Sequence, residues 1–363
     1  MKSIGKLGRR VLSIIAGTVV ATGAMAQSAV QLLPHYGRAL YLEAGSFTSA
    51  NISFGDVNGD GNLDILLAKG RHWPLRNRVL LGDGRGHVTA AYDLDTIADR
   101  SYSAHLADFN GDGALDVEIS NDRDAKRIYL NDGHGHFSRG STFGSTKWST
   151  RNVTVADINR DGLPDLIVAN RMPKSSSNYI CINHGNGKFD NHCIAFAPYP
   201  ATTITAADIN HDGWLDLVVP HRDGGQSYVY LASPGGKFSD ARRIPFGPPD
   251  AEIRAAEVAD LNGDGLPDIV AIDASENAAR RGVVIFHGKR SGGFDPAVRI
   301  EDGERWPYAL AVGDLNKDGR PDILVGHRGA PSTIHFNQGP GRSFAAEDFG
   351  DSRGDAYGFA IAD

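Results

Sequence analysis

Residues 56–64 read DVNGDGNLD, and this nine-residue phrase recurs in altered form five more times along the chain. The later copies are DFNGDGALD from Asp108, DINRDGLPD from Asp157, DINHDGWLD from Asp208, DLNGDGLPD from Asp260 and DLNKDGRPD from Asp314. Successive first aspartates lie 49 to 54 residues apart. A period of this length, sustained over most of a chain, is typical of propellers, solenoids and arrays of small modules.

Each copy of the phrase lies between segments that have the residue pattern of short strands. In the third repeat, NVTVA precedes the loop and DLIVA follows it. A further segment, NYICI, leads into the glycine-rich turn HGNGKF and then into a fourth segment. Short apolar or alternating runs bounded by turn residues favour strands, so each repeat predicts four antiparallel strands.

A single four-stranded sheet cannot bury both of its faces, whereas a ring of such sheets packs each one between two neighbours. The sequence therefore predicts an all-β fold, a β-propeller of four-stranded blades, with residues 27–363 as a single domain. An open solenoid and a row of independent modules are the alternatives.

The repeat count predicts seven blades, of which the seventh is incomplete. Six repeats are full, and a partial seventh covers residues 355–363, where AYGFAIAD resembles the segment YALAVGD that precedes the sixth loop. Asp363 lies 49 residues after Asp314, within the range of the other spacings. A strand from residues 37–45 (GRALYLEAG) would then complete the last blade. The alternative is six blades with one additional strand.

The six loops have the residue pattern of a calcium site. Each places aspartate at positions 1, 5 and 9, asparagine at position 3 and glycine at position 6. Oxygen ligands without histidine or cysteine favour a hard cation, and six or seven of them favour calcium over magnesium. Three carboxylates within nine residues also repel one another unless a cation lies among them. The alternative is a set of turns whose carboxylates accept hydrogen bonds from backbone amides.

With the carbonyl of position 7 included, each loop offers five ligand residues, and we expect about six Ca²⁺ ions. The predicted ligands are Asp56, Asn58, Asp60, Asn62 and Asp64; Asp108, Asn110, Asp112, Ala114 and Asp116; Asp157, Asn159, Asp161, Leu163 and Asp165; Asp208, Asn210, Asp212, Trp214 and Asp216; Asp260, Asn262, Asp264, Leu266 and Asp268; and Asp314, Asn316, Asp318, Arg320 and Asp322.

Through these D-x-N-x-D-G-x-x-D loops the chain resembles the FG-GAP/VCBS-type repeat proteins, whose propeller is similar to that of integrin α-subunit heads. The resemblance extends roughly from Arg38 to Asp363. It implies calcium in the loops, with the same residues as ligands, and it suggests a role in adhesion.

Residues 1–26 have the pattern of a bacterial-type secretory signal. Lys2, Lys6, Arg9 and Arg10 precede an apolar stretch, and AMA at residues 24–26 matches a cleavage site. We therefore expect the mature chain in the periplasm or outside the cell, without a transmembrane span; an uncleaved anchor is the alternative. In such an oxidising compartment Cys181 and Cys193, placed symmetrically about a turn at Gly187, predict a cross-strand disulfide. A buried free pair and metal binding are the alternatives.

Composition limits the remaining classes. The 363 residues are 41% hydrophobic, which is too apolar for intrinsic disorder, and the formal net charge is −7. The loops hold 18 of the 44 acidic residues, so the acidity reflects metal ligands rather than a basic partner. No nucleic-acid motif is present, and we expect a monomer that binds no nucleic acid.

Arginine recurs six or seven residues after the last loop aspartate in five repeats. This recurrence predicts a ligand surface on the face of the ring opposite the loops. Guanidinium groups with aromatic rings suit an anionic ligand that has apolar faces. The predicted ligand-binding residues are Arg71, Arg123, Arg171, Arg222, Arg328, His221, His327, Tyr102, Trp148, Trp306 and Tyr308. His72, Trp73, Arg151, Tyr199, Arg254 and Tyr357 belong to the same loops and blade-to-blade connections.

These features favour a secreted binding or adhesion module for an acidic glycan or another cell-surface component. A carbohydrate-active enzyme is the less favoured alternative, with polysaccharide lyase-like β-elimination by His221, His327, Tyr102 or Tyr308. A structural repeat protein without a ligand is the third. No nucleophile or metalloprotease motif is present, so the sequence assigns no catalytic residue.

Overall fold

The strands fall into groups of four that follow the sequence repeat. A computed structural model describes residues 42, 48–171, 177–189, 192–300 and 304–362. The strands are β1 (Ser49–Gly55), β2 (Asp64–Lys69), β3 (Arg78–Gly82) and β4 (Val88–Asp93); β5 (Ser101–Ala107), β6 (Asp116–Asn121), β7 (Lys126–Asn131) and β8 (Phe137–Phe143); β9 (Thr150–Ala156), β10 (Asp165–Asn170), β11 (Asn178–Cys181) and β12 (Ile194–Phe196); β13 (Thr205–Ala207), β14 (Asp216–Val219), β15 (Ser227–Tyr230) and β16 (Arg243–Phe246); β17 (Ile253–Ala259), β18 (Asp268–Asp273), β19 (Gly282–Phe286) and β20 (Val298–Arg299); and β21 (Trp306–Gly313), β22 (Asp322–Arg328), β23 (Ser332–Asn337) and β24 (Phe344–Phe349).

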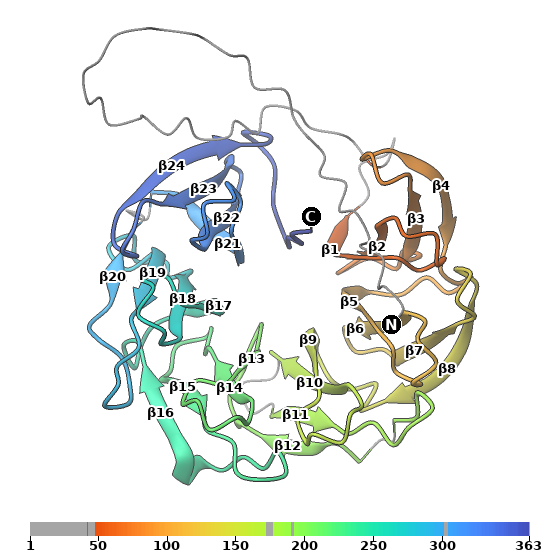
Figure 1. Ribbon diagram of the computed structural model, residues 1–363, viewed down its shortest axis with the longest axis horizontal. Coiled ribbons are helices and arrows are strands. Elements are labelled where there is room, and N and C mark those ends of the chain that lie inside the picture. The colour runs from red at the N-terminus through yellow and green to blue at the C-terminus, as the bar shows by residue number, and fades with distance from the viewer. Residues whose placement is uncertain (1–41, 43–47, 172–176, 190–191, 301–303, 363) are drawn as a thin grey trace, which may run out of the picture. The chain divides into compact units, whose positions relative to one another are not determined.

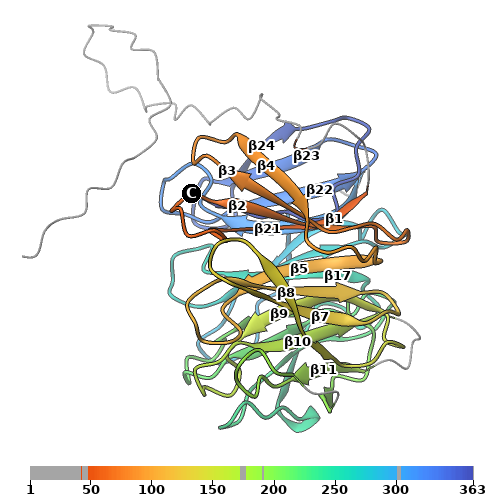
Figure 2. The same ribbon diagram turned by 90° about the vertical axis from the view of Figure 1, so that its right-hand side faces the viewer.

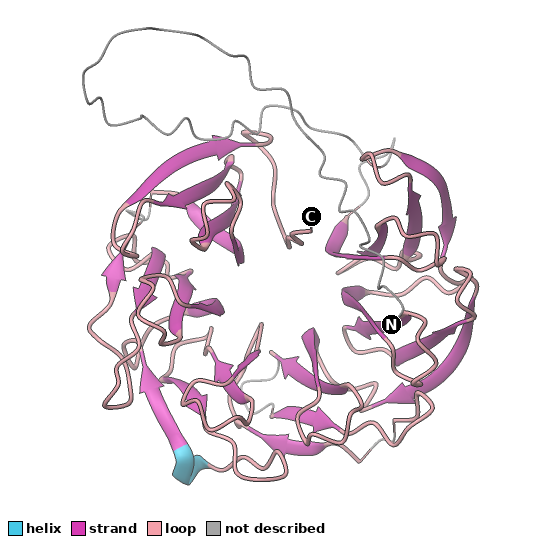
Figure 3. Ribbon diagram, in the orientation of Figure 1, coloured by secondary structure: helices cyan, strands magenta, loops and turns pink. Residues whose placement is uncertain are grey.

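Each group of four forms one antiparallel sheet in chain order, which confirms the predicted all-β propeller with four-stranded blades. Figure 1 shows the sheets around a central space, with the first strand of each sheet facing the centre and the fourth on the outside. In the side view of Figure 2, β5, β7 and β17 extend roughly along the central axis. Apart from the short helix η1 (Asp240–Arg242), the described residues are strands, turns and loops (Figure 3).

The core consists of apolar clusters between neighbouring blades. Successive side chains of a strand point to opposite faces, so one strand serves two clusters. Leu166 of β10 packs with Ile128 of the preceding blade, whereas Ile167 packs with Leu217 of the following blade. Leu166 and Ile167 are both fully buried. Each blade is therefore stabilised by burial against its neighbours rather than on its own.

A hydrogen bond that recurs at three blade junctions adds to this packing. Asn131, at the end of β7, donates through Nδ2 to the carbonyl of Val57 in the loop of the preceding blade, at 2.8 Å. Asn183 donates in the same way to Phe109 at 2.9 Å, and Asn337 to Leu261 at 2.8 Å. The end of a third strand thus fixes the backbone of its neighbour's acidic loop.

The predicted seventh blade needs correction, because the described chain forms six blades. Residues 356–362 have no strand assignment. Arg328 forms a β-bridge with Asp355, and Ala356 N donates to His327 O at 3.2 Å. Gly358 approaches the backbone of Ala50, and Figure 1 shows this segment between β21 and β1. With no described second strand to pair with, the segment stays outside the sheets.

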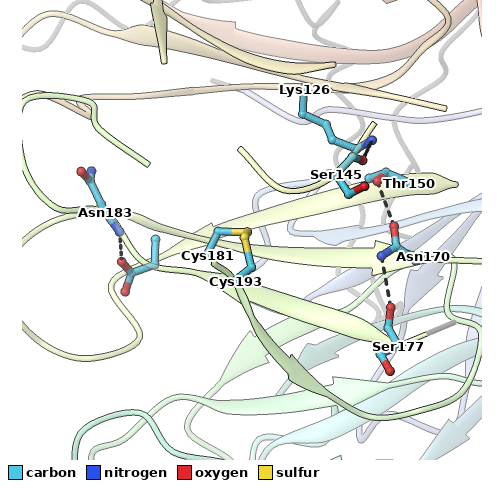
Figure 4. The surroundings of a disulfide bond; sticks show 9 residues. Lys126, Ser145, Thr150, Asn170, Ser177, Cys181, Asn183 and Cys193 are labelled. Carbon is cyan, nitrogen blue, oxygen red and sulfur yellow. Dashed lines mark hydrogen bonds between the residues drawn. A yellow bond between two sulfur atoms is a disulfide. The ribbon is translucent and has the colours of Figure 1, made fainter. Parts of the chain in front are cut away.

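Cys181 and Cys193 form a disulfide within the third blade. The register that pairs Ile180 with Ile194 places the two cysteines opposite each other, one residue nearer the turn. Figure 4 shows the bond together with Asn170 at the end of β10, which is hydrogen-bonded to Thr150 and to Ser177.

The predicted signal sequence and the strand at residues 37–45 lie outside the described residues, except for Leu42. His35–Asp363 forms one compact unit. Within the described ranges, no helix has the length and apolar character needed to cross a bilayer.

Candidate functional site

A cavity of about 550 Å³ lies among the inner strands and is lined by residues of all six blades. A repeated register produces its wall, because the residue six positions before each loop's first aspartate faces the cavity. These residues are Ala50, Tyr102, Arg151, Thr202, Arg254 and Tyr308, together with Tyr357 of the C-terminal segment. Six residues of extended chain span roughly 20 Å, so this ring lies at the opposite end of the inner strands from the acidic loops.

Arg71, Arg171 and Arg222, which follow the second strands, also line the cavity. Their loops pair with the start of the next inner strand: Arg71 N donates to Ser101 O at 3.0 Å, and Arg171 N to Ser149 O at 3.1 Å. This pairing fixes the backbone of Arg71 and Arg171 beside the start of the next blade. Together with Arg151 and Arg254, five guanidinium groups therefore line one cavity, which we call the arginine pocket.

Two of the five arginines are neutralised by acidic neighbours. Arg151 lies 3.1 Å from Asp122, and Arg171 lies 3.1 Å from Asp223. Arg71, Arg222 and Arg254 have no carboxylate within 4 Å among the described residues. The pocket therefore carries an excess of positive charge.

Arg254 is the most enclosed of the five, with only 6% of its surface exposed. Its Nε donates to Tyr308 O at 2.7 Å, and its guanidinium carbon lies 3.2 Å from the centre of the Tyr308 ring. Its buried Nη1 has no hydrogen-bond partner among the described residues. Burial lowers the pKa of Arg254 to about 9, so the side chain remains a cation at neutral pH.

Arg71 links three aromatic side chains of the pocket. Its Nη2 donates to Tyr308 Oη at 3.0 Å, and its guanidinium carbon lies 3.7 Å from the centre of the Tyr357 ring. The Tyr102 ring centre lies 5.4 Å from the same carbon. Tyr102 Oη in turn lies 3.0 Å from Nδ1 of His72.

The pKa values of the two inner tyrosines are shifted in opposite directions, because the nearby cations outweigh burial at Tyr308 but not at Tyr102. Burial alone would raise the pKa of Tyr308, but Arg254, Arg71 and Arg222 outweigh it and lower the pKa to about 8. Burial raises the pKa of Tyr102, and the nearby Arg151 and Arg71 only reduce that shift. The two phenols therefore differ in acidity within one cavity.

Two further titratable groups line the pocket through their positions on β5 and β17. Burial lowers the pKa of His105 to about 4, so this imidazole is neutral at pH 7. Burial raises the pKa of Glu257 to about 7, so below that pH this carboxyl group is largely protonated and does not cancel the positive charge.

Of the eleven predicted ligand-binding residues, five line the pocket: Arg71, Arg171, Arg222, Tyr102 and Tyr308. Arg123 is exposed outside it, and Arg328 lies at 5.7 Å from the Tyr308 ring centre without lining the cavity. Trp148 stacks on Tyr179 at 3.9 Å, and Trp306 lies under Arg281 at 4.1 Å.

The two predicted histidines are buried in the blades rather than presented to a ligand. His221 is 2% exposed and packs against Tyr199, and His327 is fully buried with Nδ1 2.8 Å from Pro331 O. Conversely, Arg151 and Arg254 lie on inner strands, not in connections as the sequence suggested. Counting back six residues from each loop would have found them.

In the acidic loops, the carboxylates accept hydrogen bonds from backbone amides. Asp56 accepts from Gly59 N and Gly61 N at 2.8 Å each. Asp64, which is fully buried, accepts from Val57 N and Gly82 N at 2.9 Å each. The described residues contain no cluster of three or more His, Cys, Asp or Glu side chains placed to hold a metal ion. These contacts are therefore those of the alternative prediction, in which turn carboxylates accept hydrogen bonds from backbone amides.

The donor chemistry of the loops nevertheless fits a hard cation, because each contains three carboxylates and an amide oxygen without nitrogen or sulfur ligands. Burial, with smaller contributions from neighbouring aspartates, raises the pKa of Asp116, Asp165 and Asp216 to about 6. The sixth loop differs, since Arg320 Nη2 donates to Asp318 at 2.5 Å and supplies a cation of its own.

Family comparisons match the repeats directly. The FG-GAP-like repeat matches residues 56–119, 119–168, 159–219, 221–271 and 260–325, and the FG-GAP repeat matches residues 306–349. Integrin alpha-7 of Rattus norvegicus is 34% identical over 142 residues, which is 34% of this chain and 12% of that protein. Integrin alpha-6 of Gallus gallus is 34% identical over 140 residues, covering 34% of this chain and 13% of the relative. The chain thus spans about an eighth of the length of these relatives.

Solved structures share the fold at low sequence identity. An Agrocybe aegerita lectin, described for its recognition of non-reducing terminal N-acetylglucosamine, superposes with a TM-score of 0.58 at 20% identity, over 83% of this chain and 80% of that one. BBS1N, solved in complex with ARL6DN, gives a TM-score of 0.56 at 11% identity, over 85% and 84% of the two chains. Since the repeat matches cover most of the described chain, the protein belongs to the FG-GAP repeat family and is of the integrin α head-like type.

Proposed function

We propose that this protein is an exported, calcium-stabilised binding module that takes an anionic glycan, or another anionic component of a cell surface, in the arginine pocket. The observation that carries the proposal is Arg254, a buried cation whose Nη1 lacks a partner inside the cavity. A buried unpaired donor on a charged group is costly, and a bound anion would supply the missing acceptor.

The surroundings of Arg254 favour an anion over a neutral ligand. Arg71 and Arg222 line the same cavity without an ion pair to a carboxylate within 4 Å among the described residues, although Asp223 and Glu252 act on Arg222 at longer range. Repulsion among these cations contributes, after burial, to the lowered pKa of Arg254. An anion would relieve that repulsion as well as accept hydrogen bonds, so both effects favour binding.

The aromatic wall favours a saccharide as the carrier of the charge. Tyr102, Tyr308 and Tyr357 line the pocket beside the arginines and offer apolar ring surface together with hydroxyl groups. Sugar rings present C–H faces and hydroxyl groups, and a uronate adds a planar carboxylate that suits bidentate contact with guanidinium. An acidic glycan combines all three.

Calcium in the acidic loops completes the proposal, with about six ions expected. Asp, Asn and carbonyl oxygens would hold each ion, which supplies charge neutralisation between carboxylates. The loop backbone is joined to the next blade through Asn131, Asn183 and Asn337. Ordering of the loops would therefore stabilise the junctions between blades.

Calorimetric titration with trigalacturonate, in calcium-containing buffer, tests the binding site. We expect saturable binding that a carboxyl-reduced trisaccharide does not reproduce, and a loss of at least tenfold in affinity for Arg254→Met and Arg222→Met. Arg123→Met, which replaces an exposed arginine outside the pocket, is the matched control. Equal binding of the neutral trisaccharide, or unchanged affinity of both pocket variants, would contradict the proposal.

A further inference from the structure

Two phenol groups lie close to one guanidinium in the arginine pocket. The guanidinium carbon of Arg71 lies 5.4 Å from the Tyr102 ring centre and 5.6 Å from that of Tyr308. All three side chains line the cavity. A carboxylate bound by Arg71 would therefore lie beside both aromatic side chains.

The environments of the phenols differ in the sense that acid–base catalysis requires. Tyr308 accepts a hydrogen bond from Arg71 and lies against Arg254, so its phenolate forms more readily than that of an isolated tyrosine. Tyr102 is 7% exposed and is hydrogen-bonded to His72, and burial favours its neutral form. Two like groups whose acidities are driven apart are a recurring basis for separate base and acid roles.

We propose that the arginine pocket catalyses β-elimination on uronate-containing oligosaccharides, with Tyr308 as base, Tyr102 as acid, and Arg71 and Arg254 as carboxylate binders. The inference rests on the proposed binding of an acidic glycan in this pocket. It assigns a reaction to Tyr308 and Tyr102, whose rings only contact the ligand in the binding function.

The reaction balances without a cofactor or co-substrate. The Tyr308 phenolate removes the proton from C5, which is acidified because the two guanidinium groups neutralise the adjacent carboxylate. The electron pair forms the C4=C5 double bond, and the C4–O bond to the leaving sugar breaks. Tyr102 donates its proton to that oxygen, and exchange with solvent restores both tyrosines.

Hydrolysis of the same bond is less well supported by the pocket. Glycoside hydrolysis commonly uses two carboxyl groups on opposite sides of the bond. Among the described residues that line the pocket, Glu257 is the one carboxylic acid. The phenol pair and the arginines therefore favour elimination.

The test follows trigalacturonate, a mannuronate trisaccharide and a hyaluronan tetrasaccharide by the ultraviolet absorbance of the unsaturated product, with binding measured on the same samples. We expect product from at least one substrate, and rates reduced by about 10²- to 10⁴-fold in Tyr308→Phe and Tyr102→Phe. Both variants should keep affinity within about fivefold of wild type, and Arg123→Met should keep the wild-type rate.

The outcomes separate the two proposals. Binding without unsaturated product from any of the three substrates would overturn the elimination while leaving the binding function in place. Absence of binding as well as product would overturn both. Wild-type rates in Tyr308→Phe and Tyr102→Phe would show that other groups carry the protons, and would overturn the roles assigned to the tyrosines.

Discussion

At the scale of single residues, Arg254 determines the character of the pocket. Its burial beside Tyr308 leaves one guanidinium nitrogen without a partner, and its charge helps to lower the pKa of that tyrosine to about 8. The same side chain thus makes the cavity receptive to anions and adjusts the acidity of a neighbouring phenol.

Glu257 opposes this positive charge only above its own pKa. Since burial raises that pKa to about 7, the carboxyl group is mainly neutral at pH 5.5 and mainly ionised at pH 8.5. Glu257→Gln should therefore leave the affinity for trigalacturonate nearly unchanged at pH 5.5 and increase it by roughly two- to tenfold at pH 8.5. Calorimetric titration of both proteins at the two pH values measures this. An equal effect at both would show that the charge of Glu257 does not act on the ligand.

At the scale of strands and loops, the asparagine at the end of a third strand connects two blades. Asn131 is 4% exposed, donates to Val57 O and Leu115 O, and accepts from Gly133 N and Gly135 N. It therefore satisfies four backbone groups that would otherwise be left without partners.

Asn131→Ala should lower the free energy of unfolding by about 1–3 kcal/mol, because buried backbone groups lose their partners. Urea denaturation measures the change. Ser138→Ala, at an exposed position of the neighbouring strand β8, should change stability by less than about 0.5 kcal/mol. Equal stability of both variants would show that the blade-to-blade hydrogen bonds of Asn131 do not stabilise the fold.

The disulfide acts within one element, the hairpin of β11 and β12. It closes a segment in which the cysteines are 12 positions apart. Replacing both with alanine should cost about 2–4 kcal/mol, through greater freedom of the unfolded chain. The urea midpoint, compared with and without reductant, reports this. A wild-type midpoint that reductant does not shift would contradict a stabilising role.

Local sequence patterns predicted the strands, the loops and the cysteine pairing, because each depends on a few neighbouring residues. They did not predict that His221 and His327 are buried, since burial depends on segments that lie apart in the sequence, such as Tyr199 beside His221 and Pro307 paired with His327. The prediction of seven blades treated residues 355–363 as a partial repeat. A first strand, however, joins a sheet only when the second strand of the same blade lies beside it. Arg254 was not among the predicted ligand-binding residues, because its position in the pocket depends on the common register of the inner strands.

At the scale of the whole molecule, six blades share their cores with their neighbours, so stability depends on every junction. Calcium in the loops should act on all of them together. A chelator should lower the melting temperature, and added Ca²⁺ should restore it, since an ion that binds the folded chain alone stabilises it by mass action.

Asp112→Ala tests one loop of this set without disturbing a core. Asp112 is exposed in the second loop, and its removal should reduce the bound calcium by about one ion per chain in equilibrium dialysis. Asp83→Ala, which changes an acidic turn outside the loops, should leave the calcium content unchanged. A chain that takes up no calcium, with a melting temperature insensitive to chelator, would contradict the calcium assignment.

The central claim is that the middle of the ring receives an anion. A crystal structure grown with Ca²⁺ and trigalacturonate tests it most directly. We predict a carboxylate within hydrogen-bond distance of Arg254 Nη1 and Arg71, enclosed by Tyr308 and Tyr357. A trisaccharide bound elsewhere, with only water beside Arg254, would contradict the account.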